Sequence, residues 1–144
     1  MTSPHPHPSF HFQVDAGFTR MGFARVSLPR IEREVIRYRE GADLAEAERT
    51  LPGLLRLGDC VLERGVVPPD NEFFQWMNSI GVGNAPRRDV VVSLLDHQHQ
   101  PVMSWRLRSA FPVLLDWSML DAQNSAVLIE TLRLAVDAVD VETT

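Results

Sequence analysis

Histidine side chains at two places in the sequence have the chemistry of metal ligands. His5, His7 and His11 lie close together near the N-terminus, but the prolines between them disfavour a preformed site, and structural zinc needs four fixed ligands. His97 and His99 stand two residues apart in a predicted turn, and two ligands do not complete a metal site. We interpret the first group as part of a tail and the second as exposed turn residues, and we predict no metal and no cofactor.

Two pairs of carboxylates have a spacing at which one group could act as an acid and the other as a base. The pairs are Glu32 with Glu34 and Glu46 with Glu48. Neither pair lies beside an apolar cleft that would separate the two pKa values, so solvated or arginine-paired charge is favoured. The sequence lacks G-x-S-x-G and H-E-x-x-H motifs, and its GVGN segment (81–84) follows a predicted helix instead of opening one. We predict that the protein is not an enzyme; the alternative is a hydrolase that depends on Glu46 or Glu48.

The charge balance argues against nucleic acid as the primary ligand. The 144 residues include 14 basic side chains, all arginine, against 19 acidic ones, which gives a net charge of −5. Nucleic acid binding draws its affinity from clustered cations, and the adjacent Arg87 and Arg88 are interpreted as the charged entry to a strand. Apolar runs stay far below the roughly 20 residues of a membrane-spanning helix, so no membrane binding by this chain is predicted. Cys60, the single cysteine, is predicted to be an inert buried thiol.

The clearest helical pattern begins after Asp70, which stands at the expected N-cap position. The aromatic residues of this segment could form a stacking platform for bases, but their spacing favours a helix that is anchored in the core. The predicted core anchors are Phe73, Phe74, Trp76 and Met77.

Alternation of apolar and polar residues predicts several strands. Met103, Trp105 and Leu107, for example, alternate with polar residues. The predicted strands cover residues 10–15, 21–28, 54–64, 89–95, 102–108 and 111–117. Because these strands do not alternate with helices, the pattern favours a mainly β or α+β domain, preceded by a flexible tail at residues 1–9.

Periodicity leaves three segments undecided. Residues 31–40 and 125–139 each fit one face of a helix and also fit a strand. Residues 41–53 are interpreted as a long loop bordered by Gly41 and Gly53, with a short helix as the alternative for part of it. Loops of this length inside a compact domain are usually functional.

An ordered set of short motifs extends through most of the chain. The motifs are Tyr38-Arg39-Glu40-Gly41, Leu51-Pro52-Gly53, Arg64-Gly65, Trp76, Trp105, Ala110-Phe111-Pro112 and Ile129-Glu130. Their succession resembles the tail tube proteins of contractile phages and of extracellular contractile injection systems. The resemblance implies a small antiparallel β-barrel or sandwich over residues 10–141, with one flanking α-helix and a long hairpin arm, similar in fold to the type VI secretion tube protein. It also implies that 31–40 and 125–139 are strands and that 41–53 is the loop of the arm.

The same resemblance implies a structural function. We expect a subunit that assembles into hexameric rings, which stack into a hollow inner tube through which protein cargo or phage DNA is delivered. The expected partners are further copies of the chain, the sheath protein and baseplate or hub proteins. Assembly is expected in the bacterial cytoplasm, and the product is expected to be part of a phage tail or a released tail-like particle. The alternatives are a tube-initiator ring at the baseplate and a non-assembling adaptor or binding domain of the particle.

Charged residues of the arm are the candidates for contact between subunits or between rings. They are Arg39, Glu40, Asp43, Glu46, Glu48 and Arg49. Their mixed signs suit electrostatic registration, and the alternative is a merely solvated loop. Residues 123–126 and 135–137 depart from the family's pattern, which suggests a divergent paralogue. Six copies at −5 each would give −30, a charge that favours a negative lumen which repels DNA and acidic cargo.

Overall fold

The computed structural model describes residues 8, 11–42, 48–83 and 85–143. In these ranges the chain forms nine strands and one helix. The elements are β1 (Phe12–Asp15), β2 (Arg25–Ser27), β3 (Ile31–Tyr38), β4 (Arg49–Leu57), β5 (Cys60–Gly65), α1 (Glu72–Ser79), β6 (Arg88–Leu95), β7 (Pro101–Trp117), β8 (Ile129–Ala135) and β9 (Ala138–Thr143). Of the predicted tail, residues 1–9, all but Pro8 lie outside the described residues.

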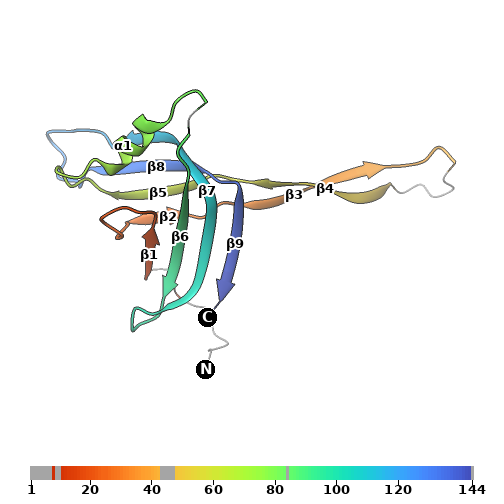
Figure 1. Ribbon diagram of the computed structural model, residues 1–144, viewed down its shortest axis with the longest axis horizontal. Coiled ribbons are helices and arrows are strands. Elements are labelled where there is room, and N and C mark those ends of the chain that lie inside the picture. Colours follow the sequence, from red (N-terminus) through yellow and green to blue (C-terminus); the bar gives the residue numbers. More distant parts are fainter. Residues whose placement is uncertain (1–7, 9–10, 43–47, 84, 144) are drawn as a thin grey trace.

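Seven strands form one antiparallel sheet that is bent into two halves. The strand order is β1-β6-β7-β8-β5-β2, and β9 pairs with β7. The first part of β7 pairs with β6 and β9, and its last part pairs with β8. In Figure 1 the strands of the first half run nearly at right angles to β5 and β8. The predicted mainly β architecture with one flanking helix is confirmed, in the form of an open sandwich of two sheet halves and not a closed barrel.

The bend in β7 lies where the backbone leaves the ordinary strand geometry. Ser109 has a φ of 53°, a conformation that L residues adopt only at a local cost, and its N–H donates to Asp89 Oδ1 at 3.1 Å. A register shift follows at Pro112, as expected of a residue that cannot donate to the ladder. Bulges of this kind bend a strand sharply, so one strand serves both halves.

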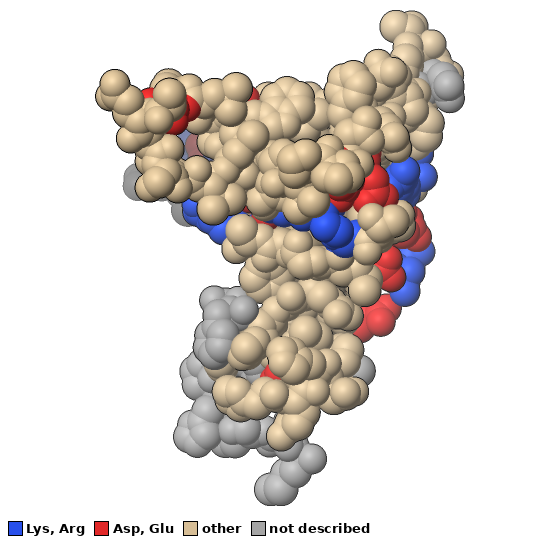
Figure 2. Space-filling model, turned by 90° about the vertical axis from the view of Figure 1, so that its left-hand side faces the viewer, with Lys and Arg blue, Asp and Glu red and all other residues tan. Residues whose placement is uncertain are grey.

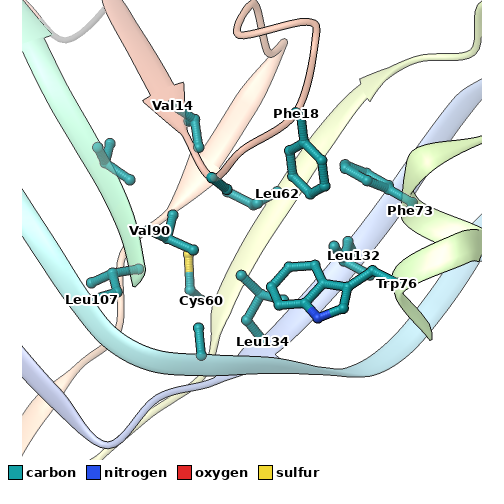
Figure 3. Packing of buried hydrophobic residues seen from close by; sticks show 13 residues of the cluster. Val14, Phe18, Cys60, Leu62, Phe73, Trp76, Val90, Leu107, Leu132 and Leu134 are labelled. Atoms are coloured by element: carbon teal, nitrogen blue, oxygen red, sulfur yellow. The ribbon is translucent and has the colours of Figure 1, made fainter. Parts of the chain in front are cut away.

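The core lies between the two halves of the sheet and is closed at one end by α1. Alternate side chains of β5, Cys60 and Leu62, are fully buried, as are Leu132 and Leu134 of β8. Figure 3 shows these side chains converging with Val90 and Leu107 from the other half. In both halves these alternate side chains are apolar and buried, which is the pattern that suits a strand with one face against the core.

The helix turns one face to this core. Phe73 and Trp76, three residues apart, are buried, and the indole N–H of Trp76 donates to Pro86 O at 3.0 Å. Phe74 was expected among the core anchors but is 50% exposed, because the residue after Phe73 is rotated by about 100° around the helix. Met77 is half-buried. The N-cap position is taken by Asn71, one residue after the predicted Asp70.

Several predicted boundaries differ from the structure. Residues 54–64 are two strands, β4 and β5, because the pairing changes at Gly58 and Asp59: β4 pairs with β3, and β5 pairs with β2 and β8. Residues 102–108 and 111–117 are one continuous strand, β7. The segment 125–139 holds β8 and the start of β9.

The strand predicted at residues 21–28 is shorter in the structure, and the strands of the arm extend over more residues than predicted. In place of 21–28, only Arg25–Ser27 pairs as β2. Of the predicted strand 10–15, residue 10 lies outside the described residues, and β1 is Phe12–Asp15. Residues 49–53, expected in a loop, belong to β4 and pair with β3. The two strands of the arm therefore continue farther from the domain than the pattern of the sequence suggests.

Removal of a buried leucine side chain tests this core. Leu62→Ala is expected to lower the free energy of unfolding by about 2–5 kcal/mol, because the fully buried side chain leaves a cavity. Urea unfolding of the dilute protein, followed by tryptophan fluorescence, measures the change. The matched control, Leu120→Ala at a residue 83% exposed, should stay within about 0.5 kcal/mol of the parent. Equal losses in the two variants would contradict this description of the core.

Candidate functional site

The described residues hold no arrangement that supports metal chemistry. Within them no group of three histidine, cysteine or acidic side chains is placed to bind a metal ion. The ring of His11 lies 6.2 Å from that of His97 and 5.4 Å from that of His99. Burial, with a smaller contribution from the charge of Asp59, raises the pKa of Cys60 to about 12, so this thiol is not a nucleophile at neutral pH. No described helix has the length and apolar character needed to cross a membrane.

The most distinctive surface is the arm formed by β3 and β4. The two strands pair antiparallel from Ile31 opposite Leu57 to Tyr38 opposite Arg49. They form a two-stranded sheet of their own, which projects from the side of the domain in Figure 1. An isolated two-stranded hairpin is at best marginally stable in water, so the arm depends on contacts beyond its own strands.

Both faces of the arm expose large apolar side chains. Val35 and Pro52 are opposite each other, and the next pair, Ile36 and Leu51, lies on the other face because successive side chains alternate. The exposed fractions are 52% for Ile31, 54% for Val35, 50% for Ile36, 46% for Leu51, 73% for Leu54 and 52% for Leu55. Large apolar side chains exposed together in this number mark a site of protein contact.

A bulge near the middle of the arm fixes how its strands approach. The register shifts between Arg33 and Val35, and Arg33 donates to Gly53 O at 3.0 Å. A Cβ on Gly53 would lie 3.0 Å from the Cβ of Glu34 and 3.2 Å from its carbonyl oxygen. Glycine is therefore required here by close contact, and Glu34 beside it forms an ion pair with Arg56.

Four of the six charged residues predicted for contact lie near the end of the arm. Arg39, Glu40, Glu48 and Arg49 are described and exposed. Asp43 and Glu46 lie outside the described residues. The structure thus places the four described side chains on the two sides of the hairpin, and their role in contact stays a prediction.

Charge of both signs is spread over the molecule. On the face shown in Figure 2, acidic and basic side chains gather in a band between the end of the molecule that carries α1 and the end that carries the β6–β7 turn. A mixed band differs from the one-sided basic surface that nucleic acid binding requires.

A buried ionic cluster that the sequence did not reveal ties the domain together. Arg64 of β5 is 1% exposed, and its Nε donates to Glu130 Oε1 of β8 at 2.6 Å. Its guanidinium lies 3.9 Å from the ring centre of Phe73 and 3.5 Å from Asp70 Oδ2. Arg20 donates to the same Asp70 oxygen at 2.7 Å. The cluster connects the β1–β2 loop, both strands and the start of α1.

One acidic group in this cluster has a shifted pKa. Burial by itself raises the pKa of Asp70, but hydrogen bonds from Arg20 and from the backbone N–H of Glu72, with the charge of Arg64, lower it by more. The pKa of Asp70 therefore lies below its ordinary value of 3.8, and the carboxylate is ionised throughout the physiological range.

Comparison with known proteins identifies what this architecture is similar to. A family model described as T4-like virus tail tube protein gp19 matches residues 8–140. The anti-feeding prophage cap, described as a tube-terminating cap, is 25% identical with a TM-score of 0.88, over 100% of this chain and 95% of the other. A chain of the PVC sheath-tube complex, from an extracellular contractile injection system, is 27% identical with a TM-score of 0.88, over 98% and 94% of the two chains.

More distant structures share the fold alone. Hcp1 from Flavobacterium johnsoniae is 14% identical with a TM-score of 0.58, over 94% of this chain and 97% of the other. No curated protein matches the sequence significantly.

The buried ionic cluster generates a test of stability. Glu130→Gln should lower the free energy of unfolding by about 3–5 kcal/mol, because it removes the nearer of the two anions that the buried Arg64 contacts. Urea unfolding at pH 7 measures the loss. The control, Asp137→Asn in the exposed pair with Arg87, should cost less than about 1 kcal/mol. A loss at Glu130 no larger than at Asp137 would show that the cluster does not support the fold.

The depressed pKa of Asp70 predicts a dependence on pH. Since the folded-state value lies below the unfolded one, the ionised group stabilises the fold above about pH 3.8, and this contribution is lost as the pH falls through the folded value. Asp70→Asn is expected to be less stable than the parent at pH 7, and the difference should shrink toward about pH 2. Unfolding curves over this range measure it, and a difference independent of pH would contradict the assignment.

Proposed function

The chain belongs to the family of the T4-like virus tail tube protein gp19, and from this premise we propose that it is a structural subunit of the hollow inner tube of a contractile injection system or phage tail. The predicted resemblance to tail tube proteins is thereby confirmed. In the proposed function, copies of the chain assemble into hexameric rings, the rings stack, and cargo travels through the lumen. The subunit acts by assembly and has no catalytic role.

The observation that carries this proposal is the apolar arm together with the open borders of the sheet. Among the described strands, β1, β2 and β9 each pair on one side only. Unpaired strand borders are templates for pairing with another chain. The arm adds large apolar side chains on both of its faces, which a lone subunit leaves in water. Contacts between copies satisfy both features.

A ring or a stack requires two different surfaces that fit each other. Heterologous contacts close into a ring when the rotation between copies allows it and otherwise continue as a filament. The projecting arm and the body of the sandwich are two such surfaces on one chain. We assign Arg39, Glu40, Glu48 and Arg49, with Asp43 and Glu46, to the contact of the arm with neighbouring subunits or rings, where their mixed charges set the register.

The proposed partners follow from the similar structures. One is a chain of a sheath-tube complex, one belongs to a sheath/tube terminator, and one to the anti-feeding prophage baseplate. We therefore assign the sheath and the baseplate or hub as further contacts, with protein cargo or phage DNA in the lumen. A hexamer carries −30 formal charges at −5 per chain, a balance that favours a lumen to which acidic cargo does not adhere. Assembly takes place in the bacterial cytoplasm, before incorporation into the particle.

A ring at the end of the tube is the second candidate. The anti-feeding prophage cap matches this chain with the same TM-score, 0.88, as the tube chain of the PVC sheath-tube complex. The two roles differ in the product of assembly, because a tube subunit stacks indefinitely whereas an end ring stops after one layer. A tube-initiator ring at the baseplate would likewise be a single ring.

Electron microscopy of the purified protein tests the proposed function. We expect rings with sixfold symmetry and stacks of rings whose fraction rises with protein concentration, because each added copy buries apolar arm surface. Size-exclusion chromatography of the same samples gives the mass of the species. Single rings without stacks would favour the end-ring role, and a stable monomer at high concentration would overturn assembly in favour of an adaptor.

A further inference from the structure

A shallow groove opens beside β2, on a face of the sandwich that the described strands leave uncovered. Its volume is about 300 Å³. One wall is the end of β2, with Val26 and Leu28, and the floor is the inner face of the other sheet half. The lining residues are Phe12, Arg25, Val26, Leu28, Val92, Leu94 and Trp105. The groove is therefore mainly apolar, with a single charged side chain on its border.

The floor of the groove continues the core-facing side of the first sheet half. In the register of the strands, Phe12 is opposite Leu94 and Val92 is opposite Trp105. Val14, farther along the same face of β1, is fully buried, whereas Phe12, Leu94 and Trp105 are only half-buried. The second sheet half thus covers one end of this face and stops at β2.

The wall of the groove is the terminal strand of the sheet. Among the described strands, β2 pairs with β5 and with no strand on its other side. A segment in extended conformation that lies in the groove would add to this border by backbone hydrogen bonds, and its side chains would cover the apolar floor. The chemistry of the groove thus calls for a strand with apolar side chains on the face turned inward.

The arm of a second copy is the extended segment that meets this requirement. Its strands are eight and nine residues long, and its exposed apolar side chains need cover. A chain cannot fill its own groove in this way, because the arm leaves the domain after Leu28 and points away from β1 and β6 (Figure 1). Each copy has one arm and one groove, which is the pairing that a heterologous contact requires.

Charge selects the face of the arm that turns inward. The face with Val35 also carries Arg33 and Arg37 and no acidic residue of β3 or β4, whereas on the face with Ile36 the acids Glu32 and Glu34 balance Arg49 and Arg56. The groove is bordered by Arg25, whose side chain is 82% exposed and pairs with Glu63 at 3.4 Å. This cation disfavours the purely basic first face more than the face with balanced charges. We propose that the arm of one copy lies in the β2 groove of its neighbour, with Ile36 and Leu51 against the floor formed by Leu94 and Trp105. This inference rests on the proposed function and names the surface that receives the arm.

Disulfide formation between copies tests the proposal. The variant Ile36→Cys with Leu94→Cys, and a second variant Ile36→Cys with Val26→Cys, are assembled and then oxidised. Because a disulfide forms only when the two Cβ atoms come within about 4.5 Å, we expect covalent oligomers up to the full ring in at least one variant, reversed by reductant. The buried Cys60 remains in all chains. The matched control pairs Ile36→Cys with Leu120→Cys, at an exposed residue of the β7–β8 loop.

The outcomes separate this proposal from the proposed function. Rings in the microscope with a covalent yield no higher than in the single-cysteine variants would overturn the docking site and leave the tube function intact. A yield equal to or greater with Leu120→Cys would also overturn it and place the arm against the β7–β8 loop. If the parent chain forms no rings or stacks at any concentration, the tube function fails, and the docking proposal fails with it.

Discussion

The passage of β7 through both halves of the sheet is the constraint on which the rest of the structure depends. Because the bend at Ser109 and the shift at Pro112 let one strand pair with β6 and β9 and then with β8, the halves enclose a single core. That core is filled by aliphatic side chains of both halves, by Phe18 and by the face of α1. Nothing in this arrangement covers the arm, which branches off between β2 and β5. The packing of the two sheet halves around one core thus stabilises the subunit but leaves the apolar side chains of the arm outside that core.

The buried ionic cluster of Arg64 contributes to the specificity of the packing and not simply to its stability. A buried ion pair is not by itself a source of stability, because desolvation offsets its attraction. Arg64, however, brings together four separate parts of the chain: Glu130 in β8, Asp70 before α1, the ring of Phe73 and, through Asp70, Arg20 of the β1–β2 loop. A wrong packing of the helix would leave the buried guanidinium without Asp70 and without the ring of Phe73, with Glu130 as its remaining partner. The cluster therefore favours one arrangement of these parts over alternatives of similar apolar burial.

How much the sequence could predict follows from where each side chain is buried. Strand β7 shows clear alternation at Met103, Trp105 and Leu107 because one of its faces is turned toward the core. The arm segment 31–40 defeated periodicity because both of its faces expose apolar side chains in the subunit, and only the resemblance to a family indicated a strand. Arg64 and Glu130 are both among the motifs of the resemblance, but their ion pair was not predicted because the two residues are 66 positions apart in the chain, and no local pattern encodes such a pairing.

The two faces of the arm imply that one contact is not sufficient for it. When Ile36 and Leu51 lie in the groove of a neighbour, Val35 and Leu55 on the opposite side are still about half exposed. Contacts around a ring can cover the first face, but a second surface has to cover the other, and a stacked ring can provide it. In that arrangement a ring at the end of a tube lacks one of its layers of contact, so end rings need a different arm surface or a different partner. The amphipathic character of the second face, with Arg33 and Arg37 beside Val35, suits a contact that is both apolar and charged. In the proposed tube, such a contact would link the register of stacked rings to the arm.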